Sequence, residues 1–233
     1  RSTHRRVWKG AQLMFRFLEL TAERWQHAEQ ILELGSGTGW LTLNIAVRLL
    51  PNAHFTLTEQ PDACEALRAQ VARVAERHPS VASRVSVCAL DWTDCASSDL
   101  VQQEWDLILG SELLYSNETL QLLPKAMHAF LCSTPAVRRR TRMLYAHVPG
   151  RKASVDAEME AQFLAADLRL QVVDYEEPCQ QPPAPATKEL LGGESDDDSS
   201  WIPDGGLFAE EDSAYRASQP APQVLEITLE STA

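Results

Sequence analysis

The chain has 233 residues, 44% of them hydrophobic, which is enough for one α/β domain with its own core. Its net charge of −12 lies in residues 174–233, which hold 14 acidic and two basic residues, so the remainder is balanced. Because acidic surfaces repel nucleic-acid phosphates, we expect no nucleic-acid partner. No apolar run reaches the roughly 18 residues that a membrane helix needs, so we also expect no membrane partner.

The cysteine pattern favours a reducing compartment. Five cysteines are scattered along the chain without a C-x-x-C pair, and the six histidines show no H-x-x-x-H pattern. This argues against a disulfide framework and against a zinc site, so we expect no metal. We expect a cytoplasmic protein, with the nucleus as an additional compartment left open. The sequence begins at Arg1 rather than Met, so a fragment is equally consistent, and the lack of a signal-peptide pattern excludes little.

Strand and helix patterns alternate along the first 177 residues, as judged from apolar spacing and from turn residues. In chain order we predict a helix at 8–21, a strand at 30–34, a helix at 40–50, a strand at 54–59, a helix at 61–78 with Pro61 in its first turn, strands at 84–90 and 105–111, a helix at 118–131 that Pro124 bends or divides, a strand at 140–148, a helix at 154–168 and a strand at 169–177. This order predicts a mostly parallel sheet with helices on both faces.

The composition changes after this alternation ends. Residues 178–222 are rich in Pro, Gly, Ser and acid, which is typical of an irregular insertion. Residues 223–230 then alternate polar and apolar side chains, as a half-exposed seventh strand would. We therefore predict a single α/β domain over 1–177, an insertion at 178–222 and a return to the same domain at 223–233.

A glycine-rich turn joins the first strand to the second helix and reads Glu33-Leu34-Gly35-Ser36-Gly37-Thr38-Gly39. Glycine lets the backbone turn tightly and lets a ligand approach closely, and the following helix offers unpaired N–H groups. The spacing is G-x-G-x-G, whereas dinucleotide sites use G-x-G-x-x-G. It resembles the first motif of S-adenosylmethionine methyltransferases, which implies that Glu33, Gly35, Ser36, Gly37 and Gly39 bind that cofactor. A plain strand–turn–helix is the alternative.

Two more candidate groups end neighbouring strands. Glu59 ends the second strand about 20 residues after the loop, where a carboxylate can accept hydrogen bonds from ribose hydroxyls. Asp91 and Trp92 end the third strand, where a carboxylate can accept from an adenine amino group and an indole can stack on the ring. The alternatives are an ordinary strand-end acid and a surface turn. Right-handed crossovers place the ends of strands one, two and four around one crevice.

Taken together, the motifs resemble the seven-strand protein-lysine methyltransferases known as methyltransferase-like or family 16. The resemblance runs from about Val7 to Tyr175 and includes the last strand. It rests on Val7-Trp8, ELGSGTG, Glu59, LDW at 90–92 and DLILGSELLY at 106–115. It implies a Rossmann-like seven-stranded fold of class I, S-adenosyl-L-methionine as cofactor and a protein substrate. We expect a basic substrate protein, and we expect the chain to be a monomer. The cofactor contacts that the resemblance implies are Trp8, Gly35, Ser36, Gly37, Glu59, Trp92 and Ser111.

The family's D-x-x-Y motif falls on Glu112-Leu113-Leu114-Tyr115, with Glu in place of Asp and therefore a side chain one methylene longer. Our hypothesis for the catalytic residues is that Glu112 holds the incoming amine by charge-assisted hydrogen bonds and Tyr115 walls the lysine channel. Alternatively, Glu112 caps the following turn and Tyr115 packs on the core. Tyr145 and His147, at the end of the fifth strand, are further residues that could face the cleft.

The predicted function is methyl transfer from S-adenosylmethionine to a protein amine, with lysine as the acceptor. One alternative changes the acceptor to arginine or a small amine. Another is a cofactor-binding scaffold with weak catalysis, whose acidic segment recruits a basic partner. The Asp-to-Glu change in the motif favours that last alternative.

Overall fold

A computed structural model describes residues 7–133, 141–150, 153–174 and 222–230. The insertion predicted at 178–222 lies outside these residues, apart from Pro222, and so do the last residues of the strand predicted at 169–177.

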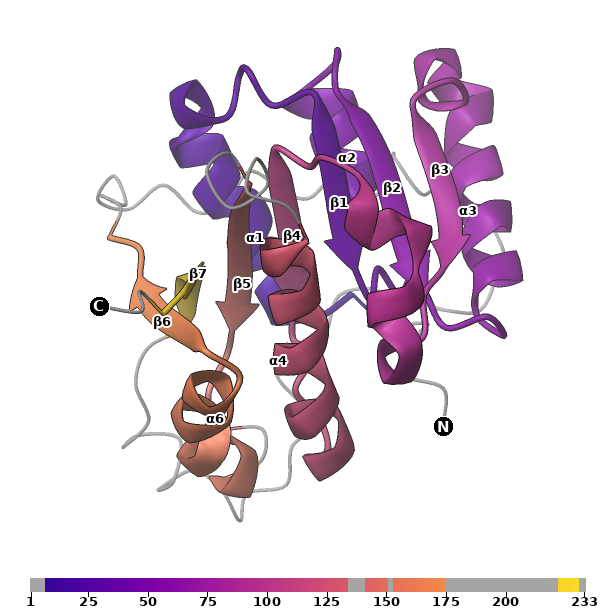
Figure 1. Cartoon of the computed structure of the whole chain (residues 1–233). Coiled ribbons are helices and arrows are strands. Elements are labelled where there is room, and N and C mark those ends of the chain that lie inside the picture. Colours follow the sequence, from indigo (N-terminus) through magenta and orange to yellow (C-terminus); the bar gives the residue numbers. More distant parts are fainter. Residues whose placement is uncertain (1–6, 134–140, 151–152, 175–221, 231–233) are drawn as a thin grey trace, which may run out of the picture.

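The described strands form one seven-stranded sheet in the order β3-β2-β1-β4-β5-β7-β6 (Figure 1). Its strands are β1 (Gln30–Leu34), β2 (His54–Glu59), β3 (Val85–Ala89), β4 (Leu107–Ser111), β5 (Arg142–His147), β6 (Leu168–Val172) and β7 (Gln223–Leu229). The first five pair in parallel, and β7 pairs antiparallel with both β5 and β6. This confirms the predicted fold class and returns the seventh strand to the same sheet.

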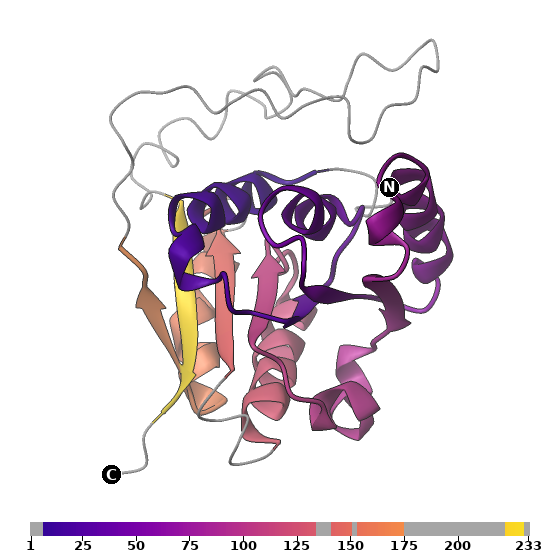
Figure 2. The same cartoon turned by 90° about the horizontal axis from the view of Figure 1, so that it is seen from above.

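Helices cover both faces of the sheet, as the view along the layers shows (Figure 2). On one face lie α1 (Lys9–Leu20), α2 (Trp40–Arg48) and α3 (Cys64–Arg77), and on the other lie α4 (Asn117–Cys132) and α6 (Ala153–Ala165). Short 3₁₀ helices complete the described elements, namely η2 (Ala22–Arg24), η3 (Pro79–Val81), η4 (Trp92–Ser97) and η5 (Asp99–Gln102).

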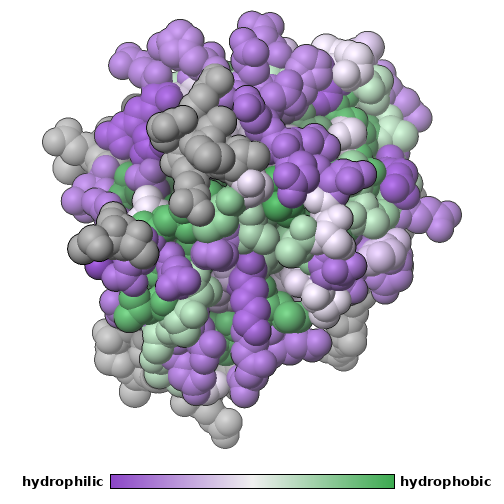
Figure 3. Space-filling model, viewed as in Figure 1, coloured by the Kyte–Doolittle hydropathy of each residue, from purple (hydrophilic) through white to green (hydrophobic). Residues whose placement is uncertain are grey.

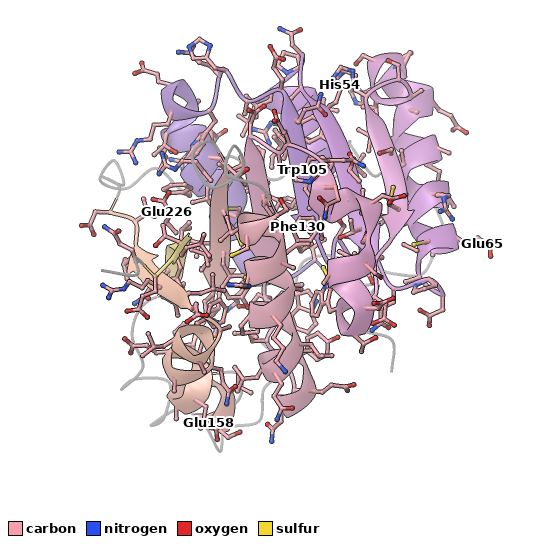
Figure 4. All side chains as sticks on the ribbon, viewed as in Figure 1. His54, Glu65, Trp105, Phe130, Glu158 and Glu226 are labelled. Carbon is pink, nitrogen blue, oxygen red and sulfur yellow. The ribbon has the colours of Figure 1, made fainter. Side chains whose placement is uncertain are left out.

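Each face of the sheet has its own hydrophobic cluster. Phe17 of α1 and Phe55 of β2 are buried in the first cluster. Trp105 and Phe130 of α4 are buried in the second cluster (Figure 4). Fully burying one such side chain contributes about 1.5–3 kcal/mol, so the two clusters hold the helices to the sheet and fix where the strand ends lie.

The strand order reverses beside β1, which pairs with β2 on one side and with β4 on the other. The register aligns Leu34 with Gly110 and Glu59 with Ala89, so the carboxyl ends of these strands meet at one edge. Ligands of open α/β sheets bind in the crevice at such a reversal. The predicted meeting of strands one, two and four at this edge is therefore confirmed.

One prediction about proline was wrong, and a second was wrong in one of its two alternatives. Pro61 lies in a turn closed by the Ala63 N–H bond to the Gln60 carbonyl, and α3 begins only at Cys64. Pro124 does not divide its helix, because α4 is continuous across it. The absent N–H at Pro124 is outweighed by a capping box between Ser116 and Thr119 and by a buried apolar face.

The described residues contain neither a membrane-spanning helix nor a metal-binding group. No helix there is long and apolar enough to cross a membrane. No group of three or more His, Cys, Asp or Glu side chains in that part of the chain is placed to hold a metal ion.

Candidate active site

A pocket lies at the carboxyl edge of β1, β2, β3 and β4. Its walls are the loop after β1, the ends of β2 and β4, the turn after β3, the start of α4 and the residues before α1. Eleven of the twelve predicted site residues line it, namely Trp8, Glu33, Gly35, Ser36, Gly37, Glu59, Asp91, Trp92, Ser111, Glu112 and Tyr115. The twelfth, Gly39, is the N-cap of α2 and does not line the pocket.

The three loop glycines all have left-handed backbone angles, with φ of 58° at Gly35, 55° at Gly37 and 71° at Gly39. A Cβ at Gly35 would lie 2.5 Å from Leu113 Cδ2, and one at Gly39 would lie 2.9 Å from a Leu67 methyl carbon. A Cβ at Gly37 would meet no atom within 4 Å. Gly35 and Gly39 therefore allow close packing, whereas Gly37 presents bare backbone to open space in the pocket.

Hydrogen bonds hold this loop against β2. The Ser36 N–H donates to the Thr58 carbonyl at 2.8 Å, and the Gly37 N–H donates to Glu59 Oε1 at 3.0 Å. Glu59 Oε2 also accepts from the Gln60 N–H at 2.8 Å. A carboxylate has about four acceptor positions, so a buried Glu59 with these bonds retains the capacity to accept from ligand hydroxyls.

Glu33, the one acidic residue of β1, is buried beside the loop. Its Oε2 accepts a hydrogen bond from the Thr42 hydroxyl of α2 at 2.6 Å. Burial raises the pKa of Glu33 from 4.5 to about 7, and the hydrogen bond from Thr42 opposes part of this rise. Near neutral pH, Glu33 is therefore poised between its neutral and charged forms.

The turn after β3 presents an indole to the pocket. Asp91 Oδ1 accepts from the Thr93 N–H at 2.8 Å and from the Thr93 hydroxyl at 2.7 Å. These bonds lower the pKa of Asp91 and cap η4, so they fix the turn that carries Trp92. The Trp92 ring lies 3.5 Å from where a Gly35 Cβ would be. At that distance a Cβ would be in ordinary van der Waals contact with the indole, so the close approach that Gly35 allows is that of Leu113.

Glu112 lines the pocket and contacts both α1 and the end of β5. It is 8% exposed and has an unusual φ of 55°. Its N–H donates to the Ala146 carbonyl at 3.1 Å, and its Oε1 accepts from the Val148 N–H at 2.7 Å. A Cβ at Gly10 of α1 would lie 2.5 Å from Glu112 Cγ. The longer side chain thus reaches across to the end of β5, over a helix residue that must be glycine.

Tyr145 fixes the next two residues of the motif, Leu113 and Leu114, through hydrogen bonds. This fully buried side chain accepts hydrogen bonds at its hydroxyl oxygen from the Leu113 N–H at 3.1 Å and the Leu114 N–H at 3.2 Å. Tyr115 follows directly, lines the pocket and is 39% exposed. The alternatives in which Tyr115 packs on the core and Glu112 caps the next turn do not match these contacts.

The idea that Tyr145 and His147 face the cleft was wrong, because neither lines the pocket. His147 is buried, and its Nε2 lies 3.0 Å from Asp156 Oδ1 at the start of α6. Burial lowers the pKa of His147, while Asp156 opposes that change. His147 therefore links β5 to α6 through its contact with Asp156.

Several residues that line the pocket or support its walls were not assigned that role from the sequence. Gly10 had a usable signal, because an isolated glycine inside a helical pattern often marks a close contact. Tyr145 was named as a residue that could face the cleft, but its supporting role had no signal, because that role depends on two N–H groups more than 30 residues away. Pocket-lining residues without a signal of their own include Thr38, Trp40, Ser116, Glu118, Thr119 and Leu122.

Comparison with known proteins gives related sequences and a related fold. Residues 1–153 match the sequence model of a family described as lysine methyltransferase. The chain is 30% identical over 141 residues to the protein N-lysine methyltransferase METTL21A of Danio rerio, a match that covers 60% of this chain and 61% of that protein. It is 29% identical over 120 residues to the EEF1A lysine methyltransferase 3 of Mus musculus, covering 51% of this chain and 47% of that protein.

The chain thus spans about half to three fifths of the length of the relatives it matches. Among solved structures it is similar to the mitomycin 7-O-methyltransferase MmcR, with a TM-score of 0.51 and 14% identity. That match covers 94% of this chain and 54% of the other. At this identity the similarity concerns the fold.

The pocket fits S-adenosylmethionine, the cofactor of this fold class. The bare backbone at Gly37 leaves space that a side chain would fill. Glu59 offers carboxylate oxygens suited to ribose hydroxyls, and Trp92 offers an aromatic face suited to a purine. The acidic lining also suits a ligand with a sulfonium and an ammonium group.

We predict that Gly37→Ala mainly lowers ligand affinity, whereas Gly39→Ala mainly lowers stability. Gly37→Ala places a methyl group in the pocket and forces alanine into a left-handed conformation, which costs about 1–2 kcal/mol of unfolding free energy. We expect its affinity for S-adenosylhomocysteine, measured by calorimetry, to fall at least tenfold. Gly39→Ala also overpacks the core, so we expect a larger loss of stability in denaturant unfolding. A Gly37→Ala protein that binds like wild type would show that the loop does not face the ligand.

We predict a pH-dependent stability that originates in Glu33. Its raised pKa contributes stability to the ligand-free protein that is fully present below pH 4.5 and is lost as the pH rises through about 7. Glu33→Gln removes this titration. Between pH 5 and pH 8, the unfolding free energy of the variant should therefore gain about 2–3 kcal/mol relative to wild type. Urea unfolding at both pH values measures this, with exposed Glu65→Gln as the control. A difference that stays constant with pH would contradict the raised pKa.

Proposed function

Because the chain belongs to the lysine methyltransferase family whose model matches its residues 1–153, we propose that it methylates a lysine side chain of a protein. The observation that carries this proposal is the pocket itself. There, the bare backbone of Gly37, the Glu59 carboxylate and the Trp92 indole lie in the same cavity as Glu112 and Tyr115. The first three suit the cofactor, and the last two suit an amine.

When bound, S-adenosylmethionine supplies a methyl group on a positively charged sulfur, which an amine lone pair can attack in line. A lysine amine has an ordinary pKa of about 10.4 and arrives protonated, so it must lose a proton first. The protein's task is therefore to attract the ammonium group, orient it, and release its proton. Positioning and charge placement should account for most of the rate enhancement.

The charge of the pocket suits the first step. Five carboxyl side chains line it, and none of its described lining residues is lysine or arginine. A negative cleft raises the local concentration of cations and speeds their arrival. An incoming lysine is thus favoured over an acidic or neutral side chain.

Glu112 and Tyr115 are the proposed contacts of the amine. The Val148 N–H fixes one oxygen of Glu112, so the carboxylate is already oriented before substrate binds. Its charge stabilises the ammonium form as it arrives, and the proton then passes to water or to a nearby base. Tyr115, whose exposed ring lies in the pocket wall, packs along the lysine side chain and orients its nitrogen.

We propose further that the protein acts as a monomer in the cytoplasm. The large hydrophobic side chains exposed in the described part are Tyr115, Leu164 and Val172, which are scattered, and the face shown in Figure 3 mixes hydrophilic and hydrophobic residues. The cysteines in the described residues are all free thiols, which suits a reducing compartment. Light scattering and cell fractionation test these two points.

We predict that Glu112→Gln and Tyr115→Phe each lower methyl transfer at least tenfold. Radiolabelled S-adenosylmethionine is incubated with the protein and a cell lysate, and the modified residues are mapped by mass spectrometry. Affinity for S-adenosylhomocysteine should stay within about twofold of wild type, because neither change alters the loop or Trp92. Glu158→Gln, on the outer side of α6 (Figure 4), is a control that should keep full activity.

Three results would contradict parts of this account. Label found only in small molecules or on arginine would assign a different acceptor. Tight cofactor binding without any transfer would assign a scaffold role. Unchanged rates in both variants would remove Glu112 and Tyr115 from the reaction while leaving the proposed function in place.

A further inference from the structure

The wall of the pocket opposite the glycine loop is the start of α4. Tyr115, Ser116, Glu118, Thr119 and Leu122 all line it. Because α4 follows β4 directly, its first turns lie at the edge where β4 ends (Figure 1). This wall is therefore built into the fold at the place where a substrate must enter to reach the cofactor site.

Glu118 differs from the other acids of the pocket. Glu33, Glu59, Asp91 and Glu112 each accept hydrogen bonds from neighbouring protein groups. Glu118 is exposed, and its side chain has no hydrogen bond or ion pair with the described residues. Its charge is therefore available to a ligand at the mouth of the pocket.

A structural role for Glu118 is modest in size. It lies in the first turn of α4, where a negative charge interacts favourably with the helix dipole. Glu65 occupies the same position in α3, because each of these residues is the second of its helix. Glu65 is also exposed and lies outside the pocket, at the right of Figure 4. The chain thus provides a matched control for the helix effect.

The neighbours of Glu118 indicate what it contacts. Tyr115 is exposed at the same wall, and Leu122 follows Glu118 by four residues, so it lies one helical turn further along the same side of α4. If Tyr115 packs along the methylated lysine, Glu118 lies beside the entering substrate rather than at the reacting nitrogen. A carboxylate in that position pairs with a cation of the substrate chain.

We propose that Glu118 binds a second basic side chain of the substrate protein, so that the enzyme selects lysines that lie beside another lysine or an arginine. This inference rests on the proposed function and names the class of protein segment that the site accepts. Glu118 contributes to binding and selection, whereas Glu112 and Tyr115 contact the reacting amine.

The test compares the full chain with Glu118→Gln, Glu118→Lys and the control Glu65→Gln. Each is incubated with labelled S-adenosylmethionine and a cell lysate, and each modified lysine is quantified by mass spectrometry. At lysines with a basic neighbour, Glu118→Gln should lower methylation about threefold to fivefold, the effect of one exposed ion pair. Glu118→Lys should lower it further. Affinity for S-adenosylhomocysteine and melting temperature should match those of Glu65→Gln.

A charge exchange then tests the ion pair between Glu118 and the basic residue beside the target lysine. In the most strongly modified substrate protein, the neighbouring basic residue is replaced by glutamate, which should reduce methylation by wild type and restore it for Glu118→Lys. Equal methylation by Glu118→Gln and Glu65→Gln would overturn the proposal. The same holds if Glu118→Gln lowers methylation equally at lysines with and without a basic neighbour. If wild type and Glu65→Gln modify no lysine at all, the proposed function itself fails, and that result is visible without the Glu118 variants.

Discussion

Three left-handed glycine conformations turn the chain between β1 and α2, and the other walls of the pocket are arranged around the backbone that these residues expose. Gly35 allows Leu113 to approach, Gly39 allows the core beneath α2 to close, and Gly37 faces open space. The hydrogen bond from the Gly37 N–H to Glu59 ties this backbone to the end of β2. A side chain at any of the three positions would strain the loop, so the cofactor site depends on their absence.

The second wall is fixed by contacts from a different part of the sheet. Tyr145 holds the N–H groups of Leu113 and Leu114, and the Val148 N–H holds the carboxylate of Glu112. Both interactions come from β5 or the residue after it, so this strand supports the segment on which the amine contacts lie. The longer acid of this chain matters here, because its side chain passes over Gly10 on its way to Val148. Glu112 is thus a built-in part of the wall.

The cofactor side of the pocket was largely predictable from the sequence, because it depends on local patterns. The loop follows an apolar strand and precedes an apolar helix, and Glu59 and Trp92 each end or follow a strand. Parallel pairing then brings them together without further information. The support for Glu112 and Leu113 was not predictable, because it comes from residues 32 to 36 positions away whose side chains carry no motif. Pro124 illustrates the same limit, since burial of α4 outweighs a local signal that disfavours a continuous helix.

The pocket geometry places one ligand between the loop after β1, Glu59 and Trp92. The most direct measurement is a crystal structure of the full chain with S-adenosylhomocysteine. We expect ribose hydroxyls on the Glu59 carboxylate, the adenine ring against Trp92, and the amino-acid end of the ligand beside the backbone of Gly35 and Gly37. A ligand bound elsewhere, or a well-folded protein whose pocket stays empty at saturating ligand, would contradict this expectation.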